Sequence, residues 1–209
     1  MMMNYIIGVD FDNTIISYDD ILHKVAVERS LISPSLLKSK KHIRDDIRRL
    51  PDGEIEWQKL QAVVYGPRIK EATLIDGVQA FINSCRRAGV KIYIISHKTE
   101  FANYDRMKIN LRSAALQWMF KNRFFEKDGL GFSQEDVYFE TTRLGKIKRV
   151  TELNCTHFID DLEETFLERS FPGSVEKILF APHDQTIQES RMKSFPSWLG
   201  IQRYLFNEH

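Results

Sequence analysis

Residues 5–16 read YIIGVDFDNTII, and this stretch decides the fold. Tyr5 to Val9 form a short and almost continuous apolar run, which is typical of a strand buried on both faces of a parallel sheet. Asp10 and Asp12 follow the run directly. Carboxylates at the end of such a strand act either as turn and cap residues or as part of a functional site, and the rest of the chain must distinguish the two.

The chain after this strand has two regions with different hydrophobic patterns. Residues 19–65 carry apolar residues at helical spacing without a convincing strand, and proline and glycine divide them into about three helices. From residue 76 onward helices and strands alternate, and a last helix is expected from Ser197. The four further strands expected are VKIYII (90–95), VYFET (137–141), THFIDD (156–161) and KILFAP (177–182).

This alternation predicts an α/β fold, with a doubly wound, Rossmann-like parallel sheet of about five strands that helices cover on both faces. The strand-free stretch then interrupts the sheet domain. We expect a core formed by residues 1–18 and 71–209, with residues 19–70 inserted as a helical cap.

Length and charge bound the function. A chain of 209 residues with 43% hydrophobic residues can bury a substantial core. Its 30 Lys and Arg nearly balance its 29 Asp and Glu, so no global field attracts nucleic acid or an acidic membrane. Any such binding must be local.

The cellular compartment is also predicted from simple features. Cys85 and Cys155 are expected as reduced, core-facing residues, because a helical and a strand-edge context suit them better than a disulfide. The first strand begins by Tyr5, which leaves no room for a signal peptide, and no apolar run is long enough to span a membrane. We expect a cytoplasmic protein without a membrane partner.

Polar residues recur at the ends of the other predicted strands. Ser96 follows KIYII, Asp160 and Asp161 end HFIDD, and Lys146 begins a short helix. In a doubly wound sheet the carboxyl ends of the strands share one crevice, so these side chains should meet Asp10 there. Several carboxylates in one place repel each other unless a cation lies between them, and an oxygen-only set suits Mg²⁺. A carboxylate nucleophile, a second carboxyl group, a hydroxyl, a lysine and Mg²⁺ are the parts that phosphoryl transfer through an aspartyl-phosphate needs.

At this point the sequence resembles the haloacid dehalogenase superfamily of phosphotransferases. DFDNT (10–14) is similar to its first motif, Ser96 to its second, Lys146 in RLGKIKRV to its third, and FIDD (158–161) to its fourth. The four occur in the family's order over residues 5–182. The resemblance implies the strand order 5-4-1-2-3, which places the strands that bear Asp10 and Asp160 side by side.

The resemblance also implies roles. Asp10 would be the nucleophile and would bind Mg²⁺ together with Asp160 and the backbone carbonyl of Asp12. Asp12 would protonate the leaving oxygen and later deprotonate a water molecule. Ser96 and Lys146 would hold the nonbridging phosphoryl oxygens.

Two further positions bear on the chemistry. An aspartate at position 12 is typical of the family's phosphatases and not of its dehalogenases. The third motif often has proline after its lysine, whereas Ile147 follows Lys146 here and Lys148 is also available. Lys146 is preferred because it starts the helix.

Other residues are weaker candidates. Asp161 is expected to act on the metal through water or on Lys146, and His97, Lys98 and Arg143 could contact substrate. The basic run KSKKHIRDDIRR (38–49) indicates either a solvated helix with internal ion pairs or a site for a polyanion.

The leading hypothesis is therefore a Mg²⁺-dependent phosphatase for a small phosphomonoester, such as a sugar phosphate or a nucleotide. The alternatives are a phosphatase for nucleic acid ends, a phosphomutase, and a noncatalytic binding protein with the same fold.

Overall fold

The computed structural model describes residues 5–105, 107–182 and 192–206. Its contacts divide the chain into two compact units. We call them the sheet unit (residues 1–15, 74–98 and 123–209) and the helical unit (residues 16–73 and 99–122). Two separate segments of the chain form the helical unit. The two units are described below one at a time.

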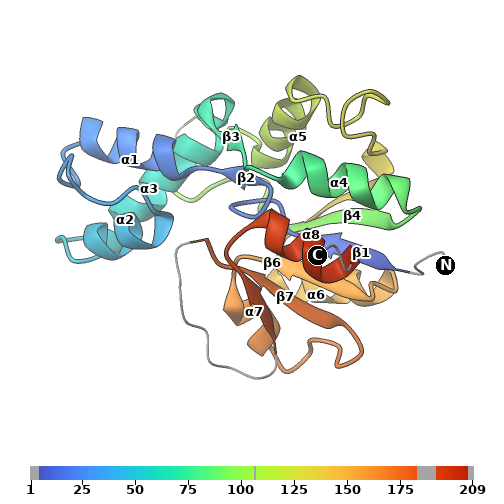
Figure 1. Cartoon of the computed structure of the whole chain (residues 1–209). Coiled ribbons are helices and arrows are strands. Elements are labelled where there is room, and N and C mark those ends of the chain that lie inside the picture. The colour runs from blue at the N-terminus through green and yellow to red at the C-terminus, as the bar shows by residue number, and fades with distance from the viewer. Residues whose placement is uncertain (1–4, 106, 183–191, 207–209) are drawn as a thin grey trace. The chain divides into compact units, whose positions relative to one another are not determined.

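The sheet unit is built on six parallel strands in the order β5-β4-β1-β6-β7-β8. β1 lies between β4 and β6, with Val9 paired to both Ile94 and Ile159, as its central place in Figure 1 shows. An apolar strand in this position is buried on both faces, which explains the uninterrupted run before Asp10. The strands are β1 (Ile6–Val9), β4 (Lys91–His97), β5 (Val137–Glu140), β6 (His157–Asp160), β7 (Glu176–Phe180) and β8 (Lys193–Phe195).

The predicted class is confirmed. When the five expected strands are numbered one to five along the chain, they correspond to β1, β4, β5, β6 and β7, and their observed order read from β7 to β5 is the predicted 5-4-1-2-3. The expected number of strands was too low, because β8 adds a sixth strand at the edge beside β7. β8 has only three residues, and Lys193 in it is exposed. So short an edge strand carries too little apolar periodicity to stand out in a sequence.

Helices cover both faces of this sheet. On one face pack α4 (Val78–Arg87) and α8 (Trp198–Phe206). There the Trp198 ring centroid lies 4.9 Å from that of Phe81 and 5.8 Å from that of Phe180. On the other face, α6 (Arg143–Glu152) and α7 (Glu163–Leu167) form a buried cluster with residues that include Ile95 and Phe158. A short 3-10 helix, η2 (Gln134–Asp136), precedes β5.

The helical unit contains the three helices expected between residues 19 and 65, which are α1 (Asp19–Glu28), α2 (Lys40–Ile47) and α3 (Gly53–Tyr65). It also contains η1 (Ile69–Glu71) and α5 (Leu111–Lys121). The short strands β2 (Ile16–Ser17) and β3 (Thr73–Leu74) pair where the chain leaves and rejoins the sheet unit.

The two compact units do not share the bounds of the expected ranges 1–18, 19–70 and 71–209, because residues 99–122 group with the helical unit. The division into a catalytic core and a cap stays a prediction. The reason for the different bounds is an apolar contact that the sequence spacing does not reveal. Trp118 of α5 is 3% exposed, and its Nε1 donates to the backbone oxygen of Ala72 at 3.0 Å. Burial of a large aromatic ring with its N–H satisfied holds α5 to η1.

Two other expectations concern the core and the membrane. Cys85 and Cys155 are free and buried, and burial raises the pKa of each thiol to about 12, as expected for reduced core residues. Within the described ranges, every helix is too short or too polar to cross a bilayer.

We predict that Gly8→Ala destabilises the sheet unit. A Cβ at Gly8 would lie 2.7 Å from Cδ2 of Phe158 and 3.1 Å from Cδ1 of Ile95, so the ring must shift. Overpacking of this kind costs about 1–3 kcal/mol. Gly173→Ala is the matched control, since nothing lies within 4 Å of its Cβ position. Urea denaturation should give a lower free energy of unfolding for Gly8→Ala and a change within about 0.5 kcal/mol for Gly173→Ala; equal values would contradict the packing argument.

Candidate functional site

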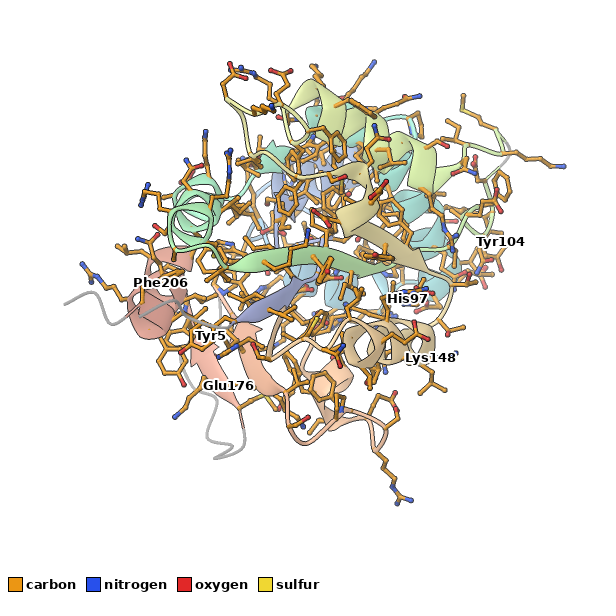
Figure 2. The ribbon with its side chains drawn as sticks, turned by 90° about the vertical axis from the view of Figure 1, so that its right-hand side faces the viewer. Tyr5, His97, Tyr104, Lys148, Glu176 and Phe206 are labelled. Atoms are coloured by element: carbon orange, nitrogen blue, oxygen red, sulfur yellow. The ribbon has the colours of Figure 1, made fainter. Side chains whose placement is uncertain are left out.

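The predicted polar residues meet at the carboxyl edge of the sheet. Asp10 follows β1, Ser96 lies near the end of β4, and Asp160 ends β6. Their exposed fractions are 4%, 1% and 0%. Figure 2 shows His97 at this edge and Tyr5 at the opposite one. Because the strands are parallel, residues far apart in the sequence arrive at one place.

Lys146 joins two of these carboxylates. Its Nζ lies 2.7 Å from Oδ1 of Asp10 and 2.7 Å from Oδ2 of Asp160, and its side chain is 2% exposed. Thr142 caps the amino end of α6 by accepting from the backbone N–H of Gly145 at 3.0 Å, which fixes the turn that carries Lys146.

Lys148 lies on the same helix but outside the site. Its side chain is 78% exposed, and its Nζ lies 3.4 Å from Oε1 of Glu152 one turn away (Figure 2). Ile147, which stands where the family often has proline, is buried in the apolar cluster under the sheet. The geometry therefore favours Lys146 over Lys148 as the lysine of the site.

Burial and neighbouring charges both shift the pKa values of Asp10 and Lys146. Burial raises the pKa of Asp10 to about 6, although Lys146 opposes the shift, and the charges of Asp160 and Asp12 add to it. Burial lowers the pKa of Lys146, but the two carboxylates outweigh it and hold that pKa above its usual value. Lys146 is therefore an ammonium group that holds two buried acids in place.

Asp12 is positioned by a tight turn. Ile15 N–H donates to the backbone oxygen of Phe11 at 3.0 Å, and Asn13 takes a φ of 61°, a conformation that asparagine tolerates well. From the far end of the chain, Nε1 of Trp198 donates to the backbone oxygen of Thr14 at 2.9 Å. The turn directs Asp12 so that its Oδ2 lies 2.7 Å from Nζ of Lys98.

A group of three carboxylates could hold a metal ion. Asp10, Asp160 and Asp161 each offer an oxygen, and these oxygens lie within 4.8 Å of one another. Oγ1 of Thr14 lies 3.5 Å from both Oδ2 of Asp10 and Oδ1 of Asp161. An all-oxygen set of this kind suits a hard divalent cation.

This group contains the side chains of Asp10 and Asp160, which were expected as ligands, and adds that of Asp161, which was expected to act through water or on Lys146. The carboxylate of Asp12 contacts Lys98 instead. A contribution of the Asp12 backbone carbonyl stays a prediction.

Two further observations fit a metal and a phosphoryl group. Asp10, Asp160 and Asp161 bring three carboxylates into one small space and Lys146 pairs with two of them, so a divalent cation would add positive charge that relieves their mutual repulsion. The buried Oγ of Ser96 has no hydrogen-bond partner among the described residues. An unpaired buried hydroxyl at this edge is available to a ligand oxygen.

The remaining candidates are engaged elsewhere. Nε2 of His97 lies 3.0 Å from the backbone oxygen of Thr141, and burial lowers the pKa of the ring. Arg143 pairs with Glu168 at 3.2 Å. Neither contact favours substrate binding, so the substrate role of His97 and Arg143 stays a prediction.

The basic run of the helical unit is rich in internal ion pairs. Arg44 pairs with Asp45 at 2.9 Å and Arg49 with Asp46 at 3.3 Å. Arg48 lies 2.6 Å from Glu54. This pattern favours the solvated-helix interpretation over a site for a polyanion.

Sequence reasoning missed Thr14 and Trp198 as parts of the site and assigned Lys98 to substrate. Thr14 lies in the quoted DFDNT motif, so proximity to Asp10 was a usable signal. Trp198 lies 184 residues away from the turn that it holds, and only tertiary structure reveals the contact.

Comparison with known proteins rests on structure. No protein-family model and no curated protein matches the sequence. Among solved structures, a haloacid dehalogenase-like hydrolase from Streptococcus pneumoniae is similar at a TM-score of 0.63 and 14% identity, over 98% of this chain and 100% of that one. A predicted phosphatase from Clostridium acetobutylicum is similar at 0.57 and 11% identity, over 99% and 100% of the two chains. The chain has the haloacid dehalogenase fold.

The fold prediction drawn from the four motifs is thereby confirmed. A haloacid dehalogenase-like hydrolase of family IA, variant 3, from Entamoeba histolytica is also similar, at a TM-score of 0.56 and 13% identity, over 99% and 100% of the two chains. These matches extend over nearly the whole chain, so they are not confined to the sheet unit.

We predict that Mg²⁺ stabilises the protein through the carboxylate group. At 100 times its dissociation constant, a ligand that binds only the folded state adds about 2.7 kcal/mol. Asp160→Asn should abolish this gain, because it removes a fully buried carboxylate. Asp128→Asn is the control, since that side chain is 78% exposed and pairs with Arg123. Thermal unfolding with and without Mg²⁺ is the measurement; an equal rise in Tm for Asp160→Asn would refute the site.

Proposed function

We propose that this chain is a Mg²⁺-dependent phosphatase of the haloacid dehalogenase superfamily that hydrolyses a small phosphomonoester through an aspartyl-phosphate. The observation that carries the proposal is the buried contact of Lys146 with Asp10 and Asp160, at the same edge of the sheet as the buried hydroxyl of Ser96. A phosphoryl group needs this combination: a carboxylate nucleophile, and donors for the oxygens that do not react.

In the first step an oxygen of Asp10 attacks phosphorus, and the bond from phosphorus to the leaving oxygen breaks as the new bond forms. Asp12 donates its proton to the leaving oxygen, which departs as an alcohol. Asp12 lies two residues beyond the nucleophile on the turn that Trp198 supports, so one short segment carries both groups.

In the second step water attacks the phosphorus of the aspartyl-phosphate. Asp12, now a carboxylate, takes the proton from the water, and the bond from phosphorus to Asp10 breaks. Orthophosphate leaves, and both aspartates return to their starting states. One carboxyl group therefore serves as acid and then as base.

Charge on the phosphoryl oxygens must be balanced throughout. The ammonium group of Lys146 and the hydroxyl of Ser96 would hold nonbridging oxygens, where negative charge develops. Mg²⁺ held by Asp10, Asp160 and Asp161 would supply the remaining positive charge and orient the phosphate.

Substrate selection would belong to the helical unit. Its two segments leave the sheet unit after β1 and after β4, both at carboxyl ends of strands. We propose that this unit is a cap that recognises the leaving group of a sugar phosphate or nucleotide and excludes water. The ion-paired basic run gives no support to a nucleic acid substrate.

We predict that Asp10→Asn abolishes turnover of p-nitrophenyl phosphate, because an amide cannot be phosphorylated. The variant should fold, since an amide has nearly the shape of a carboxylate. Steady-state kinetics with Mg²⁺ and a circular dichroism spectrum test both statements. Beryllofluoride, a phosphoryl mimic, should bind the wild type and not Asp10→Asn. Turnover of the Asp10→Asn variant at a rate near that of the wild type would contradict the aspartyl-phosphate mechanism.

The two lysines of α6 give a second test. Lys146→Ala should lower kcat by about 10²- to 10³-fold, the range seen when one donor to developing negative charge is removed. Lys148→Ala should change kcat by less than about twofold, because that side chain is 78% exposed and outside the site. The reverse pattern in kcat would show that the third motif belongs to Lys148.

A further inference from the structure

A second lysine is buried at the carboxyl edge, apart from the one that the four motifs assign. The side chain of Lys98 is 2% exposed, and its Nζ lies 2.7 Å from Oδ2 of Asp12. The same nitrogen lies 6.0 Å from the ring centroid of Phe11. A lysine is almost never buried this far unless it is paired with a negative charge.

The backbone sets the direction of this side chain. β4 ends at His97, but the N–H of Lys98 donates to the backbone oxygen of Glu140 at 2.9 Å and so continues the pairing with β5. Side chains alternate along an extended strand, so Lys98 lies on the same face as Ser96, and His97 lies on the other. Ser96 and Lys98 are therefore presented together toward the segment that bears Asp10 and Asp12.

The two buried lysines contact different carboxylates. Lys146 contacts Asp10 and Asp160, to which we assign the nucleophile and metal roles, and Lys98 contacts Asp12. The side chain of Asp12 is 17% exposed, against 6% for Asp10. Asp12 therefore has access to water, and repulsion from the neighbouring carboxylates favours its rotation outward.

We propose that Lys98 is a positioning residue that holds the Asp12 carboxyl group in the orientation needed for proton transfer. The catalytic part of this proposal rests on the proposed function. Lys98 itself does not exchange a proton or touch the phosphoryl group. Its ammonium group keeps Asp12 turned toward the leaving oxygen, so that the proton of Asp12 moves to that oxygen as its bond to phosphorus breaks. Misplacement of a reacting group by about 1 Å costs up to about 10²-fold in rate.

The kinetic test compares Lys98→Met with Lys148→Met on two substrates. Methionine keeps the unbranched apolar stem and removes the charge, and Lys148 is the exposed control. p-Nitrophenyl phosphate has a leaving group that departs without protonation, whereas an alkyl phosphate needs the acid. The quantity to compare is kcat/KM, because it reports phosphoryl transfer to Asp10 and not the later hydrolysis, which Asp12 also assists for both substrates. For Lys98→Met we expect kcat/KM on the alkyl phosphate to fall by about 10- to 10²-fold, and kcat/KM on p-nitrophenyl phosphate by less than about threefold. Lys148→Met should resemble the wild type on both substrates.

Two more variants separate positioning from a merely structural role. Lys98→Arg keeps the charge and should recover part of the rate on the alkyl phosphate. In an Asp12→Asn background, Lys98→Met should cause no further loss, because the group that it positions can no longer transfer a proton. Equal losses of kcat/KM on both substrates, or independent effects in the double variant, would overturn the positioning role. A rise in KM on both substrates would instead assign Lys98 to substrate binding and overturn it too.

A crystal structure of Lys98→Met gives a readout that does not depend on activity. The Asp12 carboxyl group should rotate away from its orientation in the wild type. An unchanged Asp12 rotamer overturns the positioning role even if the proposed function holds. A wild type that hydrolyses neither substrate in Mg²⁺ overturns the proposed function and the catalytic part of this proposal, while a rotated Asp12 in the variant still supports the structural part.

Discussion

The site depends on one interaction, the ammonium group of Lys146 between the carboxylates of Asp10 and Asp160. All three side chains are almost fully buried, so each has lost its hydration. An isolated charge in that setting is strongly unfavourable, and breaking such a pair by removing one partner costs about 3–5 kcal/mol. The arrangement is possible because β1 and β6 end side by side at one edge of the sheet, and the first turn of α6 places Lys146 within 2.7 Å of both carboxylates.

The parallel sheet makes this interaction possible. Asp10 and Asp160 are 150 positions apart, yet Val9 pairs with Ile159 and the N–H of Asp10 donates to the backbone oxygen of Ile159 at 2.8 Å. Adjacent parallel strands in this register therefore place both carboxylates next to each other at the carboxyl edge of the sheet. Their mutual repulsion is the electrostatic reason that the site calls for cations. Lys146 contacts Asp10 and Asp160, Lys98 contacts Asp12, and the oxygens of Asp10, Asp160 and Asp161 lie close enough together to hold a divalent ion as well.

Several features could be predicted from the sequence because they are local. An apolar run followed at once by Asp10 marks both a buried strand and its carboxyl end, and HFI followed by Asp160 does the same. The end of a strand and the side chain just beyond it are read from neighbouring residues, so these two positions and Ser96 were placed correctly at the edge. Lys146 could be placed because the start of a helix is also a local signal.

Only the tertiary structure decided the features that depend on side-chain direction and on packing between segments far apart in the sequence. The contact of the Asp12 carboxylate with Lys98, and the place of Asp161 beside Asp10 and Asp160, follow from the turn at Asn13 and from side-chain directions that spacing does not specify. Residues 99–122 joined the helical unit because Trp118 found a buried acceptor in a segment 46 positions away. Sequence periodicity reports which face of an element is apolar, but it does not report which partner buries that face, because many partners satisfy the same pattern. The sequence alone therefore determined where the main strands lie along the chain and which polar residues stand at their ends, and the resemblance supplied the order of those strands in the sheet. Three-dimensional packing determined which charged side chains pair, because pairing depends on side-chain direction.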